Sequence, residues 1–440
     1  MNPAPLGSFG LGWFGIARLG LVQSAIGAIV MLATSLLNRV MVVEYTLPAA
    51  LPAGLVAWHY AVQLSRPAWG HGSDRGRRRT PWIVLGMATL ALGALLAVAA
   101  LGLLATRSAW GFALAVLAFS MIGAGVGAAG TSLLALLATR VVPERRAAAA
   151  SMTWIMMITG IVVTAGVAGS LIDPFSLARL TKVASGVAGG AFLVALIGVW
   201  GVEGRSPIAP AKVENAPGPS FGVALRDMMA DSDARRFTVF VFVSMLAYSM
   251  QDLILEPFAG LLFGFTPGQS TQLSGVQHAG VLAGMLLVGV GGSAFGKRTP
   301  EGMQRWIVGG CIGSALALAG LALAARVGPN WPLAANIATL GFANGVFAVA
   351  AIGAMMGLAG ADGGNREGIR MGVWGAAQAI AFGLGGLIGA VGVDVGRALI
   401  GSTPKTFMIV FSLEALLFLG AASLALRSGS RRSSSVPSLA

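Results

Sequence analysis

The sequence Arg78-Arg79-Thr80-Pro81 leads directly into the apolar run WIVLGMATLALGALLAVAALGLL, which ends at Leu104. A run of this kind crosses a bilayer as one helix, because about 20 apolar residues rising 1.5 Å each cover the ~30 Å hydrocarbon core. The same pattern returns 219 positions later as Lys297-Arg298-Thr299-Pro300, before another long apolar run. The sequence therefore predicts a membrane protein built from two related halves.

The composition of the chain supports a membrane protein. Of its 440 residues, 56% are hydrophobic and 10% are charged, whereas a soluble domain carries about 25% charged residues. About a dozen apolar runs approach or exceed the ~18–20 residues of a spanning helix, which excludes a soluble enzyme and a disordered chain. The single cysteine, Cys311, excludes an intrachain disulfide. The positive charges lie in separate loops and not in one patch with interleaved aromatics, so we expect no nucleic-acid partner.

The apolar runs predict an all-α membrane protein with twelve transmembrane helices. The predicted spans are 20–43, 47–69, 81–104, 110–138, 148–172, 183–202, 237–263, 273–295, 304–325, 331–358, 370–393 and 405–426. Loops and span ends on the side of the N-terminus carry 22 Lys and Arg residues, and those on the other side carry six. This bias predicts that both termini are cytoplasmic.

The spans form two predicted six-helix halves, at 1–202 and 237–426. A cytoplasmic linker at 203–236 joins the halves, and a basic tail follows at 427–440. We expect the end of the linker, from Phe221 to Phe237, to form a helix on the inner membrane surface.

Further matches at spacings of 219 or 220 residues relate the two halves. The matched pairs are His59 with His278, Arg146 with Arg366, and Trp154 with Trp374. A parallel repeat of six spans is typical of the major facilitator fold, in which the substrate site lies near the midplane between the repeats.

The loop after the second span carries a charged motif, G-H-G-S-D-R-G-R-R. It resembles the facilitator loop G-x-x-x-D-R-x-G-R-R with one residue missing before the second glycine. A carboxylate among arginines forms charge-assisted bonds that can hold an inner gate closed. The alternative is a solvated basic loop that only sets topology. The gate residues are Gly70, Asp74, Arg75, Arg77 and Arg78.

Three segments resemble the PucC/LhaA family, the bacteriochlorophyll-delivery branch of the facilitators. They are N-R-V-M-V-V-E at 38–44, Q-D-L-I-L-E-P-F at 251–258 and R-T-P-W at 79–82. The short loop after span two is similar to the branch associated with bacteriochlorophyll synthesis genes. The resemblance implies light-harvesting complex assembly in the bacterial inner (intracytoplasmic) membrane, with bacteriochlorophyll as a possible ligand or cargo. It also implies antenna polypeptides and bacteriochlorophyll synthesis enzymes as partners, besides the lipid bilayer.

Ionisable side chains within spans are costly and call for a partner or a task. Asp252 and Glu256 are four residues apart and share a helix face. We predict that Arg39 pairs with Asp252 or Glu256 as an outer gate between the halves. A static buried ion pair is the alternative. Glu44 and Asp394 are expected to be solvated at the membrane interface.

The repeat places His59 and His278 at matching positions within spans two and eight. Neutral imidazole is a good metal ligand, so both histidines are candidate axial ligands of the pigment magnesium. Trp58 and Gln277 lie beside them for ring contact or hydrogen bonding. The alternative is a helix–helix hydrogen bond, worth about 0.6 kcal/mol in membranes. No direct metal site is expected.

Enzyme signatures are absent from the sequence, which has neither a nucleotide-binding glycine loop nor a G-x-S-x-G turn. We therefore expect a non-enzymatic protein that delivers bacteriochlorophyll during light-harvesting complex assembly. Two alternatives remain open: a proton-coupled small-solute transporter that uses Asp252 or Glu256 as its proton site, and a chaperone of antenna helices that binds no pigment.

Overall fold

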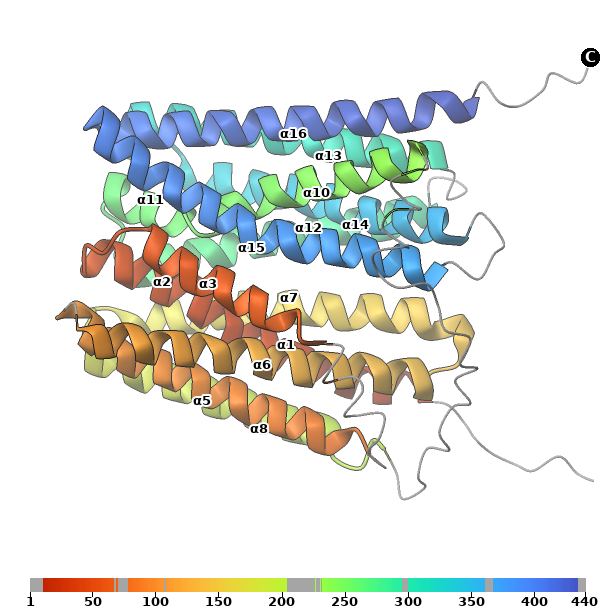
Figure 1. Ribbon diagram of the computed structural model, residues 1–440, viewed down its shortest axis with the longest axis horizontal. Coiled ribbons are helices and arrows are strands. Elements are labelled where there is room, and N and C mark those ends of the chain that lie inside the picture. The colour runs from red at the N-terminus through yellow and green to blue at the C-terminus, as the bar shows by residue number, and fades with distance from the viewer. Residues whose placement is uncertain are drawn as a thin grey trace, which may run out of the picture. The chain divides into compact units, whose positions relative to one another are not determined.

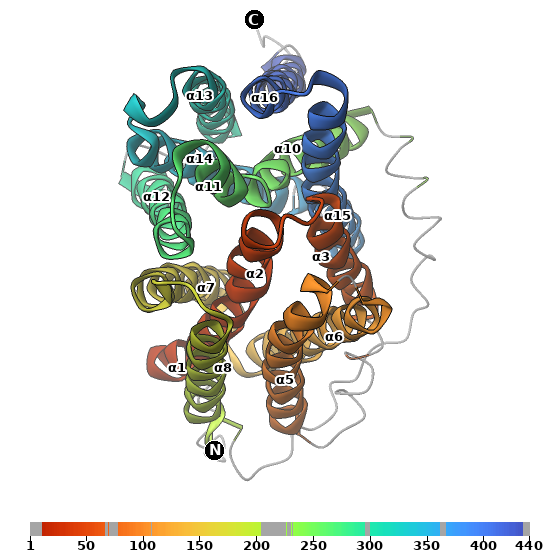
Figure 2. The ribbon, with the colours of Figure 1, turned by 90° about the vertical axis from the view of Figure 1, so that its left-hand side faces the viewer.

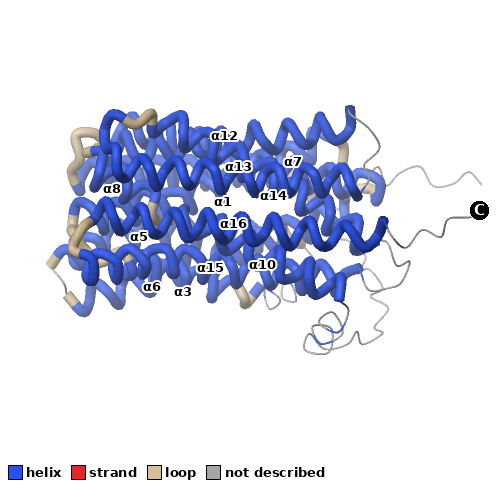
Figure 3. Tube along the Cα trace, turned by 90° about the horizontal axis from the view of Figure 1, so that it is seen from above, coloured by secondary structure: helices blue, strands red, loops and turns tan. Residues whose placement is uncertain are grey.

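The chain is helical throughout the part that the computed structural model describes, with no strand in these residues (Figure 3). The described residues are 11–66, 69, 78–106, 108–203, 226, 230, 232–294, 300–360 and 367–433. Ten of their helices are long and apolar enough to cross a membrane. The predicted spans 47–69 and 273–295 correspond to α3 (Ala50–Gln63) and α12 (Pro267–Ala294). The predicted surface helix at 221–237 lies largely outside the described residues.

The helices gather into two compact units. Unit 1 comprises 1–33 and 61–213, and unit 2 comprises 34–60 and 214–440. Unit 1 holds α1 (Trp13–Met31), α5 (Thr80–Ala105), α6 (Ala109–Arg140), α7 (Pro143–Ile172) and α8 (Leu177–Val199). Figure 1 shows these helices in the red-to-yellow part of the ribbon.

Unit 2 takes the end of the first span and most of α3, although the sequence assigns both to the N-terminal half. It also holds α12 and six further helices. These are α10 (Ser232–Asp252), α11 (Leu255–Phe263), α13 (Pro300–Val327), α14 (Leu333–Gly360), α15 (Glu367–Ile400) and α16 (Thr403–Ser433).

The internal duplication appears as one packing pattern in both units (Figure 2). In unit 1, α5 packs on α6 and α8, and α1 packs on α7 and α8. In unit 2, α13 packs on α14 and α16, and α10 packs on α15 and α16. The repeated R-T-P motif marks equivalent helix starts, because Pro81 lies in the first turn of α5 and Pro300 begins α13. Proline has no backbone N–H, and it suits this position because the N–H groups of the first turn have no acceptor within the helix.

Small residues allow these helices to approach closely. A Cβ on Gly86 of α5 would lie 2.6 Å from the Ala129 nitrogen of α6. A Cβ on Gly310 of α13 would lie 2.6 Å from the Phe347 nitrogen of α14. Lipid tails are as apolar as the helix side chains, so the hydrophobic effect does not drive two helices together in a membrane. Close approach of the backbones stabilises the pair through van der Waals contacts. The glycine-rich runs thus have a packing role.

Candidate functional site

The first transmembrane helix changes its winding where it enters unit 2. Two π-helical segments, η1 (Leu32–Leu36) and η2 (Val40–Glu44), flank the short α2 (Leu37–Arg39). Residues five apart lie about 140° apart around an α-helix, so they do not face each other. A π-helix closes its bonds at i→i+5, as between the Tyr45 N–H and the Val40 carbonyl at 3.1 Å. The wider turn lets Arg39 reach Glu44.

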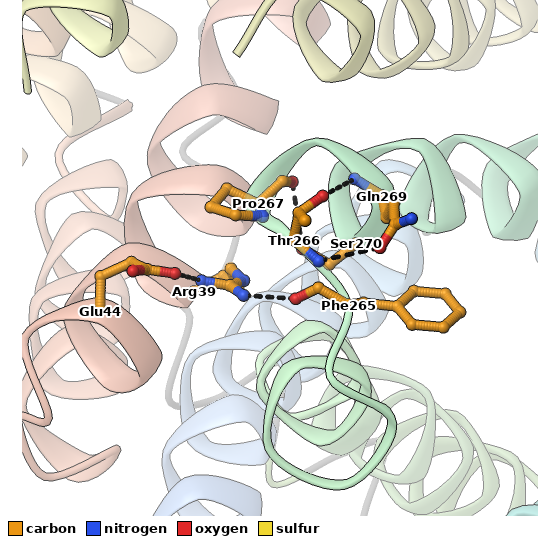
Figure 4. Close-up of polar contacts among 7 residues, drawn as sticks. All are labelled: Arg39, Glu44, Phe265, Thr266, Pro267, Gln269 and Ser270. Atoms are coloured by element: carbon orange, nitrogen blue, oxygen red, sulfur yellow. Dashed lines mark hydrogen bonds and ion pairs between the residues drawn. The ribbon is translucent and has the colours of Figure 1, made fainter. Parts of the chain in front are cut away.

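The Arg39 side chain links the end of the first span to the segment that follows α11, and we call this pair of contacts the Arg39 clamp (Figure 4). Its Nη1 pairs with the carboxylate of Glu44, and its Nη2 donates to the Phe265 carbonyl at 2.6 Å. That carbonyl follows Gly264, whose φ of 68° ends α11 in the left-handed conformation that glycine adopts freely. The Arg39 side chain is 2% exposed. The predicted partner of Arg39 is Asp252 or Glu256, but the ion pair in the structure is with Glu44, which the π-helical winding brings within reach. The Arg39 charge acts on Glu256 without forming an ion pair.

Glu44 is correspondingly less solvated than expected, with 31% of its side chain exposed. Burial and the Glu44 carboxylate both raise the pKa of the neighbouring Tyr45. Asp394 also differs from expectation. It accepts hydrogen bonds from the N–H groups of Ala49 at 3.0 Å and Ala50 at 2.7 Å, and so caps the start of α3.

Two of the three segments that carry the family resemblance, at 38–44 and 251–258, contact each other within unit 2. Asn38 Nδ2 donates to the Leu253 carbonyl at 2.7 Å, where α10 gives way to α11. The Ser35 hydroxyl donates to Glu256 and lies 3.1 Å from the Ser274 hydroxyl of α12. Asn38 and Ser35 thus join the first span to α10, α11 and α12. Serine and asparagine in an apolar run gave no sequence signal for these partners.

Asp252 lies at the centre of a second polar group in unit 2. The Gln277 amide nitrogen of α12 is 3.5 Å from Asp252 Oδ1. Asp252 also interacts electrostatically with Tyr248 of α10 and with Glu414 of α16. Asp252 and Tyr248 are partly exposed, whereas Glu256 and Glu414 are buried. Carboxyl groups from α10, α11 and α16 therefore lie in one unit.

The two repeat-related histidines have different surroundings. His59 in α3 is 1% exposed, and its ring lies edge-on to that of Tyr60. His278 in α12 is partly exposed, and its Nδ1 lies 2.9 Å from the Ser274 carbonyl. A carbonyl oxygen only accepts, so Nδ1 carries the proton and Nε2 presents the lone pair. Trp58 is exposed, while Gln277 points to Asp252.

A series of aromatic rings connects Tyr60, the neighbour of His59, with Tyr248, the neighbour of Asp252. Tyr60 stacks on Phe382 of α15 with ring centroids 6.1 Å apart, and Phe382 meets Tyr248 edge-on at 5.7 Å. Tyr248 in turn meets Phe347 of α14 at 6.1 Å. Aromatic walls with a few convergent polar groups are the usual lining of a site for an organic ligand.

Unit 1 contains a polar contact that sequence reasoning missed. Glu203, just after α8, accepts from the Arg79 N–H at 2.6 Å, the Thr80 N–H at 3.0 Å and the Thr80 hydroxyl at 2.7 Å. Arg140 of α6 donates to the Glu203 carbonyl at 2.7 Å. The carboxylate caps the start of α5, where unpaired N–H groups and the helix dipole favour an anion.

The predicted gate loop lies mostly outside the described residues. Gly70, Asp74, Arg75 and Arg77 belong to that part, and Arg78 is exposed at its edge. Among the described residues, no group of three or more His, Cys, Asp or Glu side chains could hold a metal ion. The described site therefore offers imidazole, carboxyl groups and aromatic surface.

Comparison with known proteins supports the resemblance. A family model described as PUCC protein matches residues 36–432. The "Bacteriochlorophyll synthase 44.5 kDa chain" of Rhodobacter capsulatus is 51% identical over 419 residues, covering 94% of this chain and 95% of that protein. "Protein PucC" of the same organism is 29% identical and covers 93% of this chain and 91% of its own length.

Solved transporter structures share the fold. The nucleoside transporter NupG matches with a TM-score of 0.68 at 12% identity, over 94% of this chain and all of that one. A peptide-bound transporter of the POT family matches with a TM-score of 0.68 at 13% identity, over 94% and 97% of the two chains. The expected major facilitator fold of this multi-pass membrane protein is thus confirmed.

Proposed function

Because the chain belongs to the PucC family, we propose that it delivers bacteriochlorophyll during the assembly of light-harvesting complexes in the bacterial inner membrane. The family match over 36–432 carries this proposal. The 51% identical relative, whose name places it with bacteriochlorophyll synthesis, favours a place close to the enzymes that make the pigment. The protein receives pigment from these enzymes, passes it to antenna polypeptides and makes or breaks no covalent bond itself.

His278 is the better of the two candidate ligands for the pigment magnesium. Its Nδ1–H is held by the Ser274 carbonyl, an outer contact of the kind that orients metal-bound imidazoles. The free Nε2 can then serve as an axial ligand. His278 is partly exposed, whereas His59 is 1% exposed and enclosed by its neighbours. Tyr60, Phe382 and Tyr248 supply aromatic surface for a flat macrocycle.

An absorption spectrum tests pigment binding. The protein is purified in mild detergent from a host that makes bacteriochlorophyll, as wild type and as His59→Ala, His278→Ala and double variants. We expect pigment to co-purify with the wild type and to be lost in His278→Ala and in the double variant. Added imidazole should restore binding to His278→Ala, because it replaces the missing ligand without replacing a helix contact.

His71→Ala is the matched control, since the chain has three histidines and His71 belongs to the predicted loop. It should keep its pigment. Pigment retained in the double variant would contradict ligation by His59 and His278. A wild type free of pigment would contradict delivery and favour one of the two alternatives.

A proton-coupled solute transporter is the first alternative, and the carboxyl groups of Asp252 and Glu256 within unit 2 favour it. Uptake of a labelled solute driven by a pH gradient would support it. A chaperone of antenna helices is the second alternative. Antenna polypeptides would then co-purify equally well with the wild type and with the double histidine variant.

We also propose that the loop from Gly70 to Arg78 works as an inner gate. Asp74 would hold the gate through Arg75, Arg77 and Arg78, as the motif suggests. Asp74→Asn should then reduce antenna assembly in cells while the protein level in the membrane stays unchanged. Full assembly with Asp74→Asn would leave the loop with a role in topology only.

A further inference from the structure

Among the described residues of unit 2, the buried charged side chains are two acids, Glu256 and Glu414, and one base, Arg39. Asp252, Glu256 and Glu414 come from α10, α11 and α16, and all three lie within transmembrane segments. Arg39 is the cation that acts on Glu256, but its guanidinium already pairs with Glu44. An ionised carboxylate in an apolar interior is very costly unless it is paired. Whether each of the three carboxyl groups can be ionised therefore depends on the polar and charged neighbours that it has.

Glu256 has polar support. The Ser35 hydroxyl donates to its Oε1, and the Arg39 charge acts on it. Glu414 has no such support: it is 0% exposed, and neither of its carboxyl oxygens has a hydrogen-bond partner. The charged group acting on Glu414 is Asp252, another acid. Two neighbouring carboxyls disfavour simultaneous ionisation, so the enclosed Glu414 is the one that stays neutral.

Asp252 is placed differently. It is partly exposed, in contrast to its neighbours Gln251 and Leu253. The Gln277 side chain, itself 4% exposed, directs its amide nitrogen toward Asp252. Tyr248 faces Asp252 from one turn earlier and interacts with Tyr60 of α3. Gln251 is fully buried, and neither polar atom of its side chain has a hydrogen-bond partner.

We propose that Glu414 holds a proton inside unit 2 and that Asp252 is the group through which this proton exchanges with water. The two groups lie on α10 and α16, which pack on each other, but neither Glu414 oxygen is hydrogen-bonded in this structure. Transfer therefore requires the Glu414 side chain to turn toward Asp252. The O–H bond at one carboxyl then breaks as an O–H bond at the other forms, and the net charge of the pair stays the same. Proton uptake from water then neutralises the ionised member. The other titratable group that acts on the pair is Tyr248, which itself interacts with Tyr60. The inference goes beyond pigment delivery and does not depend on the cargo.

Infrared spectroscopy tests this proposal on the full chain, purified from a host without pigment in a detergent that has no ester. The carbonyl stretch of a protonated carboxyl is observed at neutral pH, and its downshift is followed after transfer to D2O. We expect the band in the wild type and its loss in Glu414→Gln. In Asp252→Asn the band should persist, but its downshift should slow by about 10²-fold, the usual contribution of a positioned proton-transfer group.

Asp394→Asn is the matched control. Asp394 accepts hydrogen bonds from the backbone N–H groups of Ala49 and Ala50, and the asparagine side chain can still accept one of them. This variant should change neither the band nor its rate of exchange. A fluorogenic thiol dye on the buried Cys311 checks that each variant is folded. If Glu414→Gln is unfolded, Glu414→Asp keeps a carboxyl and should shift the band instead of removing it.

Two results would overturn the proposal. One is a band that stays unchanged in folded Glu414→Gln or in Glu414→Asp, because the proton would then lie elsewhere. The other is exchange in Asp252→Asn as fast as in the wild type, which would remove Asp252 from the path. Because the protein is free of pigment, neither result depends on ligation by the histidines, and the absorption experiment can fail or succeed separately.

Discussion

Arg39 shows how one side chain joins two parts of unit 2. Its guanidinium uses separate nitrogens for the Glu44 carboxylate and the Phe265 carbonyl. A planar group with several fixed donors can do this, whereas the single ammonium nitrogen of lysine is a point charge on a flexible stem. The identity of the cation at this position, and not only its charge, should therefore matter.

We predict that Arg39→Lys destabilises the protein by about 1–3 kcal/mol, because one of two partly buried acceptors loses its donor. The measurement is the thermal midpoint at which a fluorogenic thiol dye reacts with the buried Cys311, the single cysteine of the chain. Arg397→Lys is the control, since Arg397 is exposed near the end of α15. Equal midpoints for the two variants would show that the clamp contributes no stability.

At the scale of elements, α12 and α14 depend on glycine for their contact. Gly341 of α14 meets the backbone carbonyl of Gln277, and Gly345 meets that of Val281, so closely that a Cβ at either position would overlap it. Gly280 of α12 similarly faces the Ala338 carbonyl and the Phe342 nitrogen. The contact therefore sets the position of Gln277 and, through it, the surroundings of Asp252.

Gly341→Ala should destabilise the protein by about 1–3 kcal/mol, the usual cost of inserting a methyl group into a filled interface. Gly309→Ala in α13 is the matched control, because a Cβ there meets nothing within 4 Å. Alanine at this helical position should leave the stability unchanged or raise it by about 0.5–1 kcal/mol. Cys311 labelling during heating measures both variants. Similar losses for both would mean that helix propensity, and not the close contact, decides the effect.

The helices could be predicted from sequence more completely than the site. Apolar runs and the prolines of the R-T-P repeat located α5 and α13, because both signals are local. The π-helical segments gave no signal, since an extra residue per turn hardly changes an apolar pattern. The Arg39–Glu44 pair was missed for the same reason, because a spacing of five does not predict contact on an α-helix.

Other contacts of the site involve the backbone of a distant segment. Asn38 donates to the Leu253 carbonyl, and Asp394 accepts from Ala49 and Ala50. A main-chain partner leaves no complementary side chain in the sequence, so no pairing rule could find it. The residues were visible as polar groups in or beside apolar runs, but their partners needed the fold.

At the scale of the whole molecule, the Lys and Arg counts predict that both termini are cytoplasmic. Reporter fusions that are active on one side of the membrane test this at three places: after the tail at 427–440, in the linker at 203–236, and in the loop at 173–176 between α7 and α8. The first two fusions should report the cytoplasm and the third the opposite side. Any two neighbouring loops on the same side would contradict the twelve-span topology.

Unit 2 is assembled from two separate stretches of chain, 34–60 and 214–440. Asn38, Arg39 and the start of α3 all bond to the later stretch. A chain that begins at residue 214 therefore lacks part of the unit to which it belongs. We predict that residues 214–440 expressed alone are recovered poorly from the membrane, and that co-expression of residues 1–213 as a second chain restores them.

The measurement is the amount of tagged 214–440 in the membrane and the protection of its Cys311 from the thiol dye, each with and without the partner chain. Asn38→Ala in the partner chain is the informative variant, because it removes the 2.7 Å bond to the Leu253 carbonyl while unit 1 keeps all of its own residues. We expect it to reduce the recovery. A later chain that is recovered and protected equally well alone would show that residues 34–60 are dispensable, and that unit 2 folds from the C-terminal half by itself.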